Sequence, residues 1–256
     1  MHKTELNAPA VNLPSAIRAC LFDLDGVLTD TASLHAAAWK EMFDTFLRQR
    51  AADAGAQFVP FDIARDYRTY IDGKQRYDGV RSFLASRGIT LPEGSPGDSP
   101  DAVTVAGLGD RKNELVQTMI QSRGVQAYPG SVQFVSAARD AGLRRAVVSA
   151  SANCRAVVEA AGIADLLEVE VDGVVAAQEH LRGKPAPDTF LAAARILGVA
   201  PAEAAVFEDA LAGVEEGRAG SFGLVVGVDR VGQAEALREH GADVVVTDLA
   251  ELLGRA

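Results

Sequence analysis

Short runs of aliphatic and β-branched residues alternate with amphipathic stretches through the second half of the chain. The runs predict strands at 145–149, 167–171, 204–207, 223–228 and 243–246. Helical patterns between them begin at Asn153, Asp188, Ala210 and Val231. Strands that alternate with helices are typical of a parallel sheet covered by helices. This half of the chain is therefore predicted to be an α/β domain.

A further apolar run, Ala19-Cys20-Leu21-Phe22, lies far upstream and ends directly at Asp23. Because the run is continuous rather than alternating, it predicts a strand that is buried on both faces. We expect this strand at the centre of the same sheet. The predicted core is thus a Rossmann-like parallel sheet formed by residues 16–32 and 125–256.

The residues between these two parts of the core have a different pattern. Helices are predicted from 33 to about 50 and over 110–123, without regular strand alternation. Segment 94–100 consists mainly of Gly, Pro and Ser, which predicts a mobile loop between helices. We therefore expect an inserted small helical cap domain at 33–124. Residues 1–15 are polar and punctuated by proline, which predicts a disordered N-terminal tail.

Composition and charge narrow the classes of function. With 256 residues, 48% of them hydrophobic, the chain can bury a large core. It has 25 Lys and Arg against 35 Asp and Glu, so neither nucleic acid nor an anionic membrane is an expected partner. No run approaches the roughly 20 apolar residues that cross a bilayer. Cys20 and Cys154 lack disulfide or metal spacing, and we expect a cytoplasmic monomer.

The carboxyl ends of the strands are the expected place for chemistry, because ligands bind there in open α/β sheets. The first strand ends in Asp23 and Asp25, of which one can act as a nucleophile while the other moves the proton. A pair of structural turn aspartates is the alternative. A calcium loop is disfavoured because Val27 and Leu28 occupy its fifth and sixth positions, where a ligand and Gly are needed.

The predicted strand at 145–149 ends in Ser149, and Ser151 and Asn153 follow at the start of a helix. Hydroxyl groups, an amide and helical N–H groups can together bind a phosphate. Simple capping of the helix by Ser151 or Asn153 explains the same pattern. The segment therefore predicts a phosphate site only in combination with other motifs.

Two more motifs supply a cation and further carboxylates. Lys184 lies between Gly183 and Pro185, ahead of a helix, where a fixed ammonium can neutralise an aspartyl phosphate; a solvated surface Lys is the alternative. Glu208 and Asp209 end another strand. Their oxygens suit Mg²⁺, although either acid can instead cap the next helix.

These four groups, in this order, resemble the four motifs of the haloacid dehalogenase superfamily, and the resemblance covers nearly the whole chain from Ala19. It implies that Asp23 is the nucleophile and Asp25 the general acid and base. It implies that the phosphate is bound by Ser149, Ser151, Asn153 and Lys184. It further implies one Mg²⁺, held by Asp23, Asp25, Glu208 and Asp209.

Within the superfamily, segment 22–32 followed by His35 and Trp39 resembles the β-phosphoglucomutase branch. Segments 73–76, 111–113, 149–153 and 183–188 also match, while Ala152 stands where the branch often has Lys. The resemblance implies interconversion of β-glucose 1-phosphate and glucose 6-phosphate through a phospho-aspartate enzyme. Glucose 1,6-bisphosphate would be both the intermediate and the priming phosphate donor.

A mutase must hold a bisphosphate in two orientations, so it needs a second cation site away from the metal. Arg76 is the candidate, because a planar guanidinium suits bidentate contact with phosphate; a solvated helix-end Arg is the alternative. His35 and Lys112, near the two cap hinges, are expected to couple closure to the placement of the general acid. Trp39 is included in the candidate substrate site, with plain packing as the alternative.

Two other functions remain open at this point. A phosphatase acting on a small sugar phosphate would use the same core, with water instead of a sugar hydroxyl attacking the phospho-aspartate. A non-catalytic α/β binding protein is disfavoured because both Asp23 and Asp25 are present.

Overall fold

The computed structural model of the chain describes residues 11–254, and their contacts divide it into two compact units. The first unit contains the chain up to Thr29 and again from Gln126, and the second is Asp30–Val125. The insertion predicted at 33–124 begins three residues later than the second unit and ends one residue earlier.

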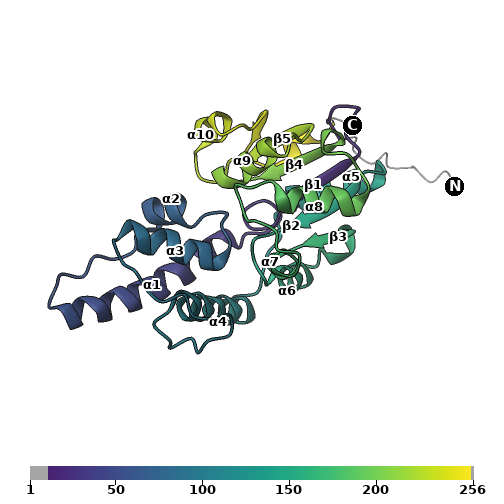
Figure 1. Cartoon of the computed structure of the whole chain (residues 1–256). Helices are drawn as coiled ribbons and strands as arrows, with labels where there is room; N and C mark the ends of the chain where they lie inside the picture. Colours follow the sequence, from purple (N-terminus) through teal and green to yellow (C-terminus); the bar gives the residue numbers. More distant parts are fainter. Residues whose placement is uncertain (1–10, 255–256) are drawn as a thin grey trace. The chain divides into compact units, whose positions relative to one another are not determined.

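The first unit is built on a six-stranded sheet in which all neighbouring strands are parallel (Figure 1). The spatial order of the strands is β3-β2-β1-β4-β5-β6. Their bounds are β1 Ala19–Asp23, β2 Arg144–Val148, β3 Val169–Val171, β4 Ala204–Glu208, β5 Leu224–Val228 and β6 Val244–Val246. The predicted α/β fold with a parallel sheet is confirmed, and β1 lies between β2 and β4.

The central strand β1 is buried on both faces, as its continuous apolar run predicts. Leu21 belongs to the apolar cluster that includes Phe190. The next residue, Phe22, points to the opposite face, where its ring stacks on Phe207 at 4.7 Å and meets Phe134 edge-on at 6.1 Å. Aromatic packing on one side and aliphatic packing on the other hold the strand that carries Asp23.

Helices connect these strands, with bounds α5 Pro129–Asp140, α6 Cys154–Ala160, α7 Gly173–Gln178, α8 Asp188–Leu197, α9 Leu211–Ala219 and α10 Ala234–Glu239. The patterns that begin at Asn153, Asp188 and Ala210 match α6, α8 and α9 to within one residue. Short 3-10 turns lie at Ala164–Leu166, Pro201–Glu203 and Leu249–Leu252. The sequence analysis did not predict α5 and α7.

The second unit is helical, as predicted, with bounds α1 Ala32–Ala54, a π-helical turn Ile63–Tyr67, α2 Arg68–Tyr70, α3 Arg76–Ser86 and α4 Val105–Arg123. Its core is aromatic, and the rings of Phe43 and Phe83 lie 4.2 Å apart. Helix α1 continues to Ala54 and stops where Gly55 adopts a left-handed φ of 59°. Helix α4 begins earlier than predicted, because the Thr104 hydroxyl accepts a hydrogen bond from the Gly107 N–H at 2.9 Å.

Segment 94–100 is a loop without helix or strand, as predicted. It is hydrogen-bonded to α4, because the Gly97 N–H donates to Asp110 Oδ2 at 3.0 Å. The mobility of this loop stays a prediction.

The predicted N-terminal tail, residues 1–15, overlaps the described residues only from residue 11. There Val11 pairs with Leu253 in an antiparallel bridge, and the Asn12 N–H donates to the Leu252 carbonyl at 2.7 Å. Because residues 11 and 12 are bonded to the C-terminal segment, the prediction of a disordered tail is wrong for this stretch. Residues 1–10 lie outside the described residues.

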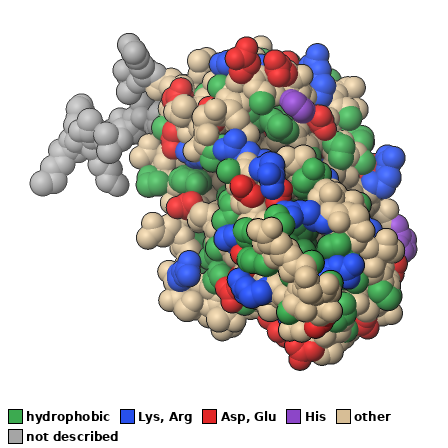
Figure 2. Space-filling view, turned by 90° about the vertical axis from the view of Figure 1, so that its left-hand side faces the viewer, with side chains coloured by type: hydrophobic (Ala, Val, Ile, Leu, Met, Phe, Trp, Pro, Cys, Tyr) green, Lys and Arg blue, Asp and Glu red, His purple; other side chains and the backbone are tan. Residues whose placement is uncertain are grey.

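The surface is consistent with the charge pattern of the sequence. On the described part of the face in Figure 2, acidic and basic side chains are interspersed. Within residues 11–254, no helix is both long enough and apolar enough to cross a membrane. Cys20 and Cys154 are both free and buried.

Candidate active site

The carboxyl ends of β1 and β4 bring one cation between two acids. The Lys184 ammonium donates to Asp23 Oδ1 at 2.5 Å and also to Glu208 Oε1. Asp23 ends β1, and Glu208 ends the neighbouring strand β4. All three side chains are almost completely buried. Asp23 and Lys184 are 161 positions apart in the sequence, yet their motifs and that of Glu208 form one cluster.

Electrostatics keep Lys184 charged in this cluster. Burial disfavours the ammonium form, but the nearby carboxylates of Asp23 and Glu208 outweigh it and hold the pKa of Lys184 well above its ordinary value. Lys184 is therefore a permanent cation beside Asp23, rather than the solvated surface Lys of the alternative interpretation.

The pKa of Asp23 is shifted so that its neutral form is favoured. Its burial raises its pKa well above the ordinary value; Lys184 opposes the shift, whereas Glu208 and Asp25 add to it. The site thus holds more carboxylates than cations. A further cation next to Asp23 would favour the ionised carboxylate that a nucleophile requires.

A tight turn after β1 brings Asp25 close to Asp209. Gly26 adopts a φ of +91°, and its N–H donates to the Thr29 carbonyl at 2.8 Å. A Cβ at Gly26 would lie 1.9 Å from Asp209 Oδ2, so the Asp209 carboxylate packs directly on the backbone next to Asp25. Only glycine combines this backbone conformation with this close approach.

The turn is also held by Arg230, which follows the carboxyl end of β5 (Leu224–Val228). The Arg230 Nε–H donates to the Gly26 carbonyl at 2.9 Å, and the guanidinium lies over the Tyr128 ring at 3.8 Å. The Ser131 hydroxyl donates to the Val27 carbonyl at 2.6 Å. The sequence analysis missed Arg230, because the residues that it joins are 204 positions apart and no local pattern marks the contact.

The loop after β2 places three predicted phosphate ligands in sequence. The Ser151 N–H donates to Ser149 Oγ, and the Asn153 N–H donates to Ser151 Oγ, both at 3.1 Å. Each hydroxyl accepts from the backbone, which leaves its proton for an outside acceptor. Asn153 stands at the N-cap of α6 without a side-chain cap bond to that helix. Asn153 therefore does not cap α6 through its side chain, whereas the Ser151 hydroxyl does accept from the backbone N–H of the N-cap residue.

The residues around Asp23 fit a Mg²⁺ ion. Asp23 ends β1, and the Asp209 carboxylate lies against Gly26 in the turn that follows. Mg²⁺ prefers oxygen donors and needs few protein ligands because it retains water. No three acidic, His or Cys side chains in residues 11–254 form a metal site by themselves. The fit rests on carboxylates supplemented by a backbone oxygen.

Both carboxylate oxygens of Glu208 accept hydrogen bonds. Its Oε1 accepts from Lys184, and its Oε2 accepts from the Ala210 N–H at 2.8 Å. A Cβ at Gly213 would lie 1.9 Å from Oε1, so the carboxylate also packs against α9. Each carboxylate oxygen has a further lone pair, so Glu208 can hold Lys184 and its role as a metal ligand stays a prediction.

The four cap candidates belong to the second unit. Arg76 begins α3, where its Nη2 lies 3.3 Å from Asp110 Oδ1 and its guanidinium lies over the Tyr77 ring at 5.0 Å. Arg76 is thus a positioned guanidinium, not a freely solvated one.

His35, Lys112 and Trp39 form a second group in this unit. The Lys112 Nζ lies 3.0 Å from His35 Nδ1 and 5.0 Å from the Trp39 ring centroid. Trp39 is buried and stacks on Phe43 at 5.4 Å. These contacts match the packing interpretation of Trp39 and join the two residues predicted at the cap hinges.

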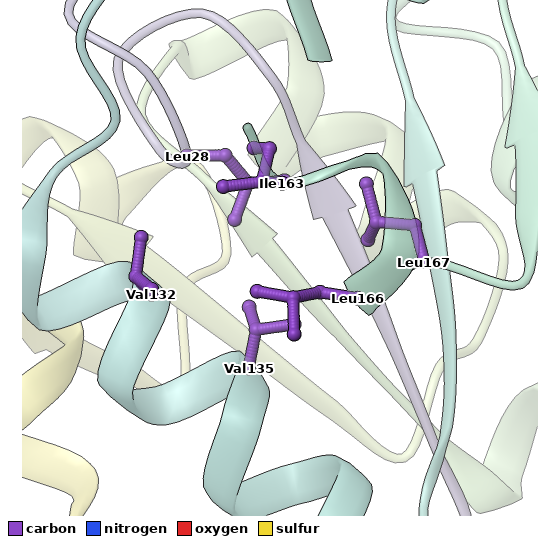
Figure 3. A pocket seen from close by; sticks show the side chains of 6 residues that line it. All are labelled: Leu28, Val132, Val135, Ile163, Leu166 and Leu167. Atoms are coloured by element: carbon purple, nitrogen blue, oxygen red, sulfur yellow. The ribbon is translucent and has the colours of Figure 1, made fainter. Parts of the chain in front are cut away.

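A pocket elsewhere in the first unit has a different character. It is lined by Leu28, Val132, Val135, Ile163, Leu166 and Leu167 (Figure 3). All six side chains are aliphatic, so the pocket offers no group that would bind a sugar phosphate.

Comparisons with known proteins agree with the architecture. The family model for haloacid dehalogenase-like hydrolases matches residues 17–220. β-Phosphoglucomutase from Mycobacterium bovis is 58% identical over 252 residues, which cover 97% of this chain and 96% of that protein. Hexitol phosphatase A from Escherichia coli is 31% identical over 91% of each chain. The crystal structure of β-phosphoglucomutase from Clostridium difficile has a TM-score of 0.72 at 26% identity, with 92% of this chain and 93% of that chain covered.

Proposed function

Because the chain belongs to the β-phosphoglucomutase branch of the haloacid dehalogenase-like hydrolases, we propose that it interconverts β-glucose 1-phosphate and glucose 6-phosphate. The identity of 58% to β-phosphoglucomutase from Mycobacterium bovis carries the choice of a mutase, and the buried cluster in which Lys184 joins Asp23 to Glu208 supports phosphoryl transfer. A carboxylate that attacks a phosphate dianion needs fixed cations and donors around it, and this cluster supplies them.

In the proposed reaction, Asp23 already carries a phosphoryl group from the priming donor. Asp25 takes the proton of the C6 hydroxyl of β-glucose 1-phosphate, and this oxygen forms a bond to phosphorus while the bond from phosphorus to Asp23 breaks, which gives the bisphosphate. In the second half, Asp23 attacks the C1 phosphate of the bisphosphate, the bond from phosphorus to the C1 oxygen breaks, and Asp25 returns a proton to that oxygen, so that glucose 6-phosphate leaves and Asp23 is phosphorylated again. Lys184 and the hydroxyls of Ser149 and Ser151 bind the phosphate oxygens.

Mg²⁺ belongs to this proposal as the cofactor, with glucose 1,6-bisphosphate as the priming phosphate donor. Asp23, Glu208, Asp209 and the Asp25 carbonyl would hold the ion. When bound, it neutralises charge on the transferring phosphate. Burial raises the pKa of Asp23, and a bound cation would favour its ionised form.

We assign the phosphate that is not being transferred to Arg76. Its guanidinium is already oriented by Asp110 and Tyr77, so little conformational freedom is lost when it binds a phosphate. His35 and Lys112 are proposed to act as a pair at the cap hinges. The cytoplasm is the proposed location, which suits two free cysteines, and the monomer stays a prediction.

A sugar phosphatase is the second candidate, because hexitol phosphatase A shares 31% identity with the chain. The core chemistry is the same until the phospho-aspartate is attacked. The two functions differ in whether a sugar hydroxyl or water is the second nucleophile.

The test is to incubate the protein with β-glucose 1-phosphate, Mg²⁺ and a trace of glucose 1,6-bisphosphate, and to follow two products. Glucose 6-phosphate without equivalent free phosphate is the expected result. Free phosphate as the main product would identify a phosphatase instead. If neither glucose 6-phosphate nor free phosphate forms, both assignments of the substrate are contradicted.

A further inference from the structure

The loop that follows β5, residues 229–233, contacts both segments that form the proposed metal site. The Arg230 Nε–H donates to the Gly26 carbonyl at 2.9 Å, and the Gln233 side-chain amide donates to the Asp209 carbonyl, also at 2.9 Å. Both accepting carbonyls lie beyond the ends of β1 and β4, where the hydrogen bonds of the sheet no longer hold the backbone. One short loop is therefore bonded to the turn after β1 and to the end of β4.

The loop has a conformation that is fixed by its own first residue. Asp229 Oδ1 accepts from the N–H groups of Gly232 at 2.7 Å and of Gln233 at 2.8 Å. The Asp229 N–H donates to the Val246 carbonyl of β6 at 2.7 Å. An aspartate that accepts from backbone groups farther along the chain stabilises a tight turn. The two donors thus extend from a loop that is anchored to the sheet.

Helix capping does not explain the glutamine in this loop. Gln233 stands at the N-cap of α10 but makes no side-chain cap bond to that helix. Ser, Thr, Asp and Asn are the residues preferred at this position, because their short side chains reach the free N–H groups of the first turn. The side-chain amide of Gln233 is bonded instead to Asp209, 24 positions away.

Arg230 also contacts the segment after β6. Its Nη1–H donates to the Thr247 carbonyl at 2.8 Å and lies 3.3 Å from Asp248 Oδ2. These contacts use a different nitrogen from the one that donates to Gly26, since a guanidinium offers several donors in a fixed geometry. Arg230 therefore joins the turn after β1 to the C-terminal segment, rather than holding that segment alone.

We propose that Arg230 and Gln233 are positioning residues for the Mg²⁺ site. Arg230 fixes the turn that contains the Asp25 carbonyl. Gln233 fixes the backbone of Asp209, whose carboxylate lies against Gly26. Together they set the spacing of two oxygen ligands, and partners behind metal ligands commonly tune affinity in this way. The inference rests on the proposed function, which assigns Mg²⁺ to these ligands.

The test measures the binding of Mn²⁺, in place of Mg²⁺, to the protein without sugar, with free Mn²⁺ counted by its electron paramagnetic resonance signal. The relevant site is the one at which Mg²⁺ competes and which Asp209→Asn loses. Gln233→Leu and Arg230→Met each remove a donor while keeping most of the side-chain volume. Each is expected to raise the dissociation constant of the ion about tenfold. Arg230→Lys, which keeps a cationic donor, should recover part of the loss.

The matched control is Gln49→Leu. Gln49 is exposed in the second unit, where its side-chain amide donates to Asp53 at 2.8 Å, so the substitution removes the same kind of hydrogen bond away from the site. This variant should bind Mn²⁺ as the wild type does.

A merely structural role would give a different result. General damage would lower the folded fraction, which thermal unfolding measures, and leave the dissociation constant of the folded molecules unchanged. If the ligands are misplaced instead, saturating Mg²⁺ should bring the kcat of Gln233→Leu to within about twofold of the wild-type value. An unchanged dissociation constant in either Gln233→Leu or Arg230→Met overturns the inference.

Failure of the proposed function is distinguishable from failure of this inference. A wild type that binds Mn²⁺ but forms no glucose 6-phosphate would contradict the proposed substrate, and the comparison of variants would still decide the roles of Arg230 and Gln233. A wild type that binds no Mn²⁺ would contradict the metal site, and the inference with it.

Discussion

Glu216, on α9, is a completely buried carboxylate. Burial raises the pKa of Glu216 to about 7, although Lys184 and the bonds from Thr189 and Phe190 oppose the shift. Its ionised form therefore costs folding free energy.

The raised pKa of Glu216 predicts how the free energy of unfolding depends on pH. The folded pKa of Glu216, about 7, lies above its ordinary value of 4.5. Its stabilising contribution is therefore complete below pH about 4.5 and is lost as the pH rises through about 7. The loss amounts to about 3 kcal/mol. Urea unfolding at pH 5 and pH 8, without Mg²⁺, should show this extra decrease in the wild type and not in Glu216→Gln. Equal pH dependence in both proteins would contradict it.

At the scale of elements, parallel strands explain why distant motifs meet. β2, β1 and β4 are neighbours, so the residues that follow their carboxyl ends converge at one edge of the sheet. The turn after β1 adds Asp25 because Gly26 reverses the chain against Asp209. The proposed metal site therefore depends on one turn and one strand end, not on a sequence motif alone.

Replacing Gly26 by Ala should separate backbone strain from damage to the metal site. Gly142→Ala is the matched control, because Gly142 has a φ of 78° and nothing within 4 Å of the added Cβ, whereas at Gly26 the Cβ would lie 1.9 Å from Asp209 Oδ2. Each substitution should cost about 1–3 kcal/mol of stability. Only Gly26→Ala should also raise the Mg²⁺ concentration needed for half-maximal activity, by roughly tenfold or more. An unchanged Mg²⁺ requirement would remove Asp209 from the metal site.

Some strands and helices could be predicted from the sequence, and others could not. The strands ending at Asp23 and Glu208 could be predicted because each is an apolar run that stops at an acid. Helix α7 has six residues, too few for a 3.6-residue period to emerge. Its one local signal is Asp172, which caps the Val174 and Val175 N–H groups.

Side-chain contacts between distant parts of the chain could not be predicted from the sequence. Glu215 and Glu216 look alike in the sequence, and only packing distinguishes the exposed one from the buried one. Glu208 and Asp209 form one acidic pair in the sequence, yet the structure bonds both Glu208 oxygens within the protein. Roles of this kind depend on which groups the sheet brings together, and sequence spacing does not contain that information.

In the whole molecule, the proposed function needs residues from both units. The first unit contains every residue that we assign to phosphoryl transfer, and Arg76 lies in the second unit. A mutase needs both phosphates of the bisphosphate to be held, whereas hydrolysis of a simple phosphoester needs only the first unit's chemistry. The two activities should therefore respond differently to a change in the second unit.

Arg76→Ala should lower the formation of glucose 6-phosphate by about 10–100-fold, because a charged hydrogen-bonding partner of one phosphate is lost. Hydrolysis of p-nitrophenyl phosphate should remain close to the wild-type rate. Arg81→Ala is the control on the same helix, since Arg81 is 46% exposed and pairs with Asp78 and Glu93 at the surface. Equal losses in both activities would indicate general damage rather than a lost phosphate site.

The central claim is that the transferred phosphoryl group is carried by Asp23, and identification of the modified residue tests it most directly. The protein would be mixed with glucose 1,6-bisphosphate and Mg²⁺, quenched, reduced with borohydride and analysed by peptide mass spectrometry, with Asp23→Asn in parallel. Reduction converts an aspartyl phosphate to homoserine, so homoserine at position 23 of the wild type, absent from Asp23→Asn, is the predicted result. Active enzyme with no modification at Asp23, or with the modification at another residue, would contradict the account.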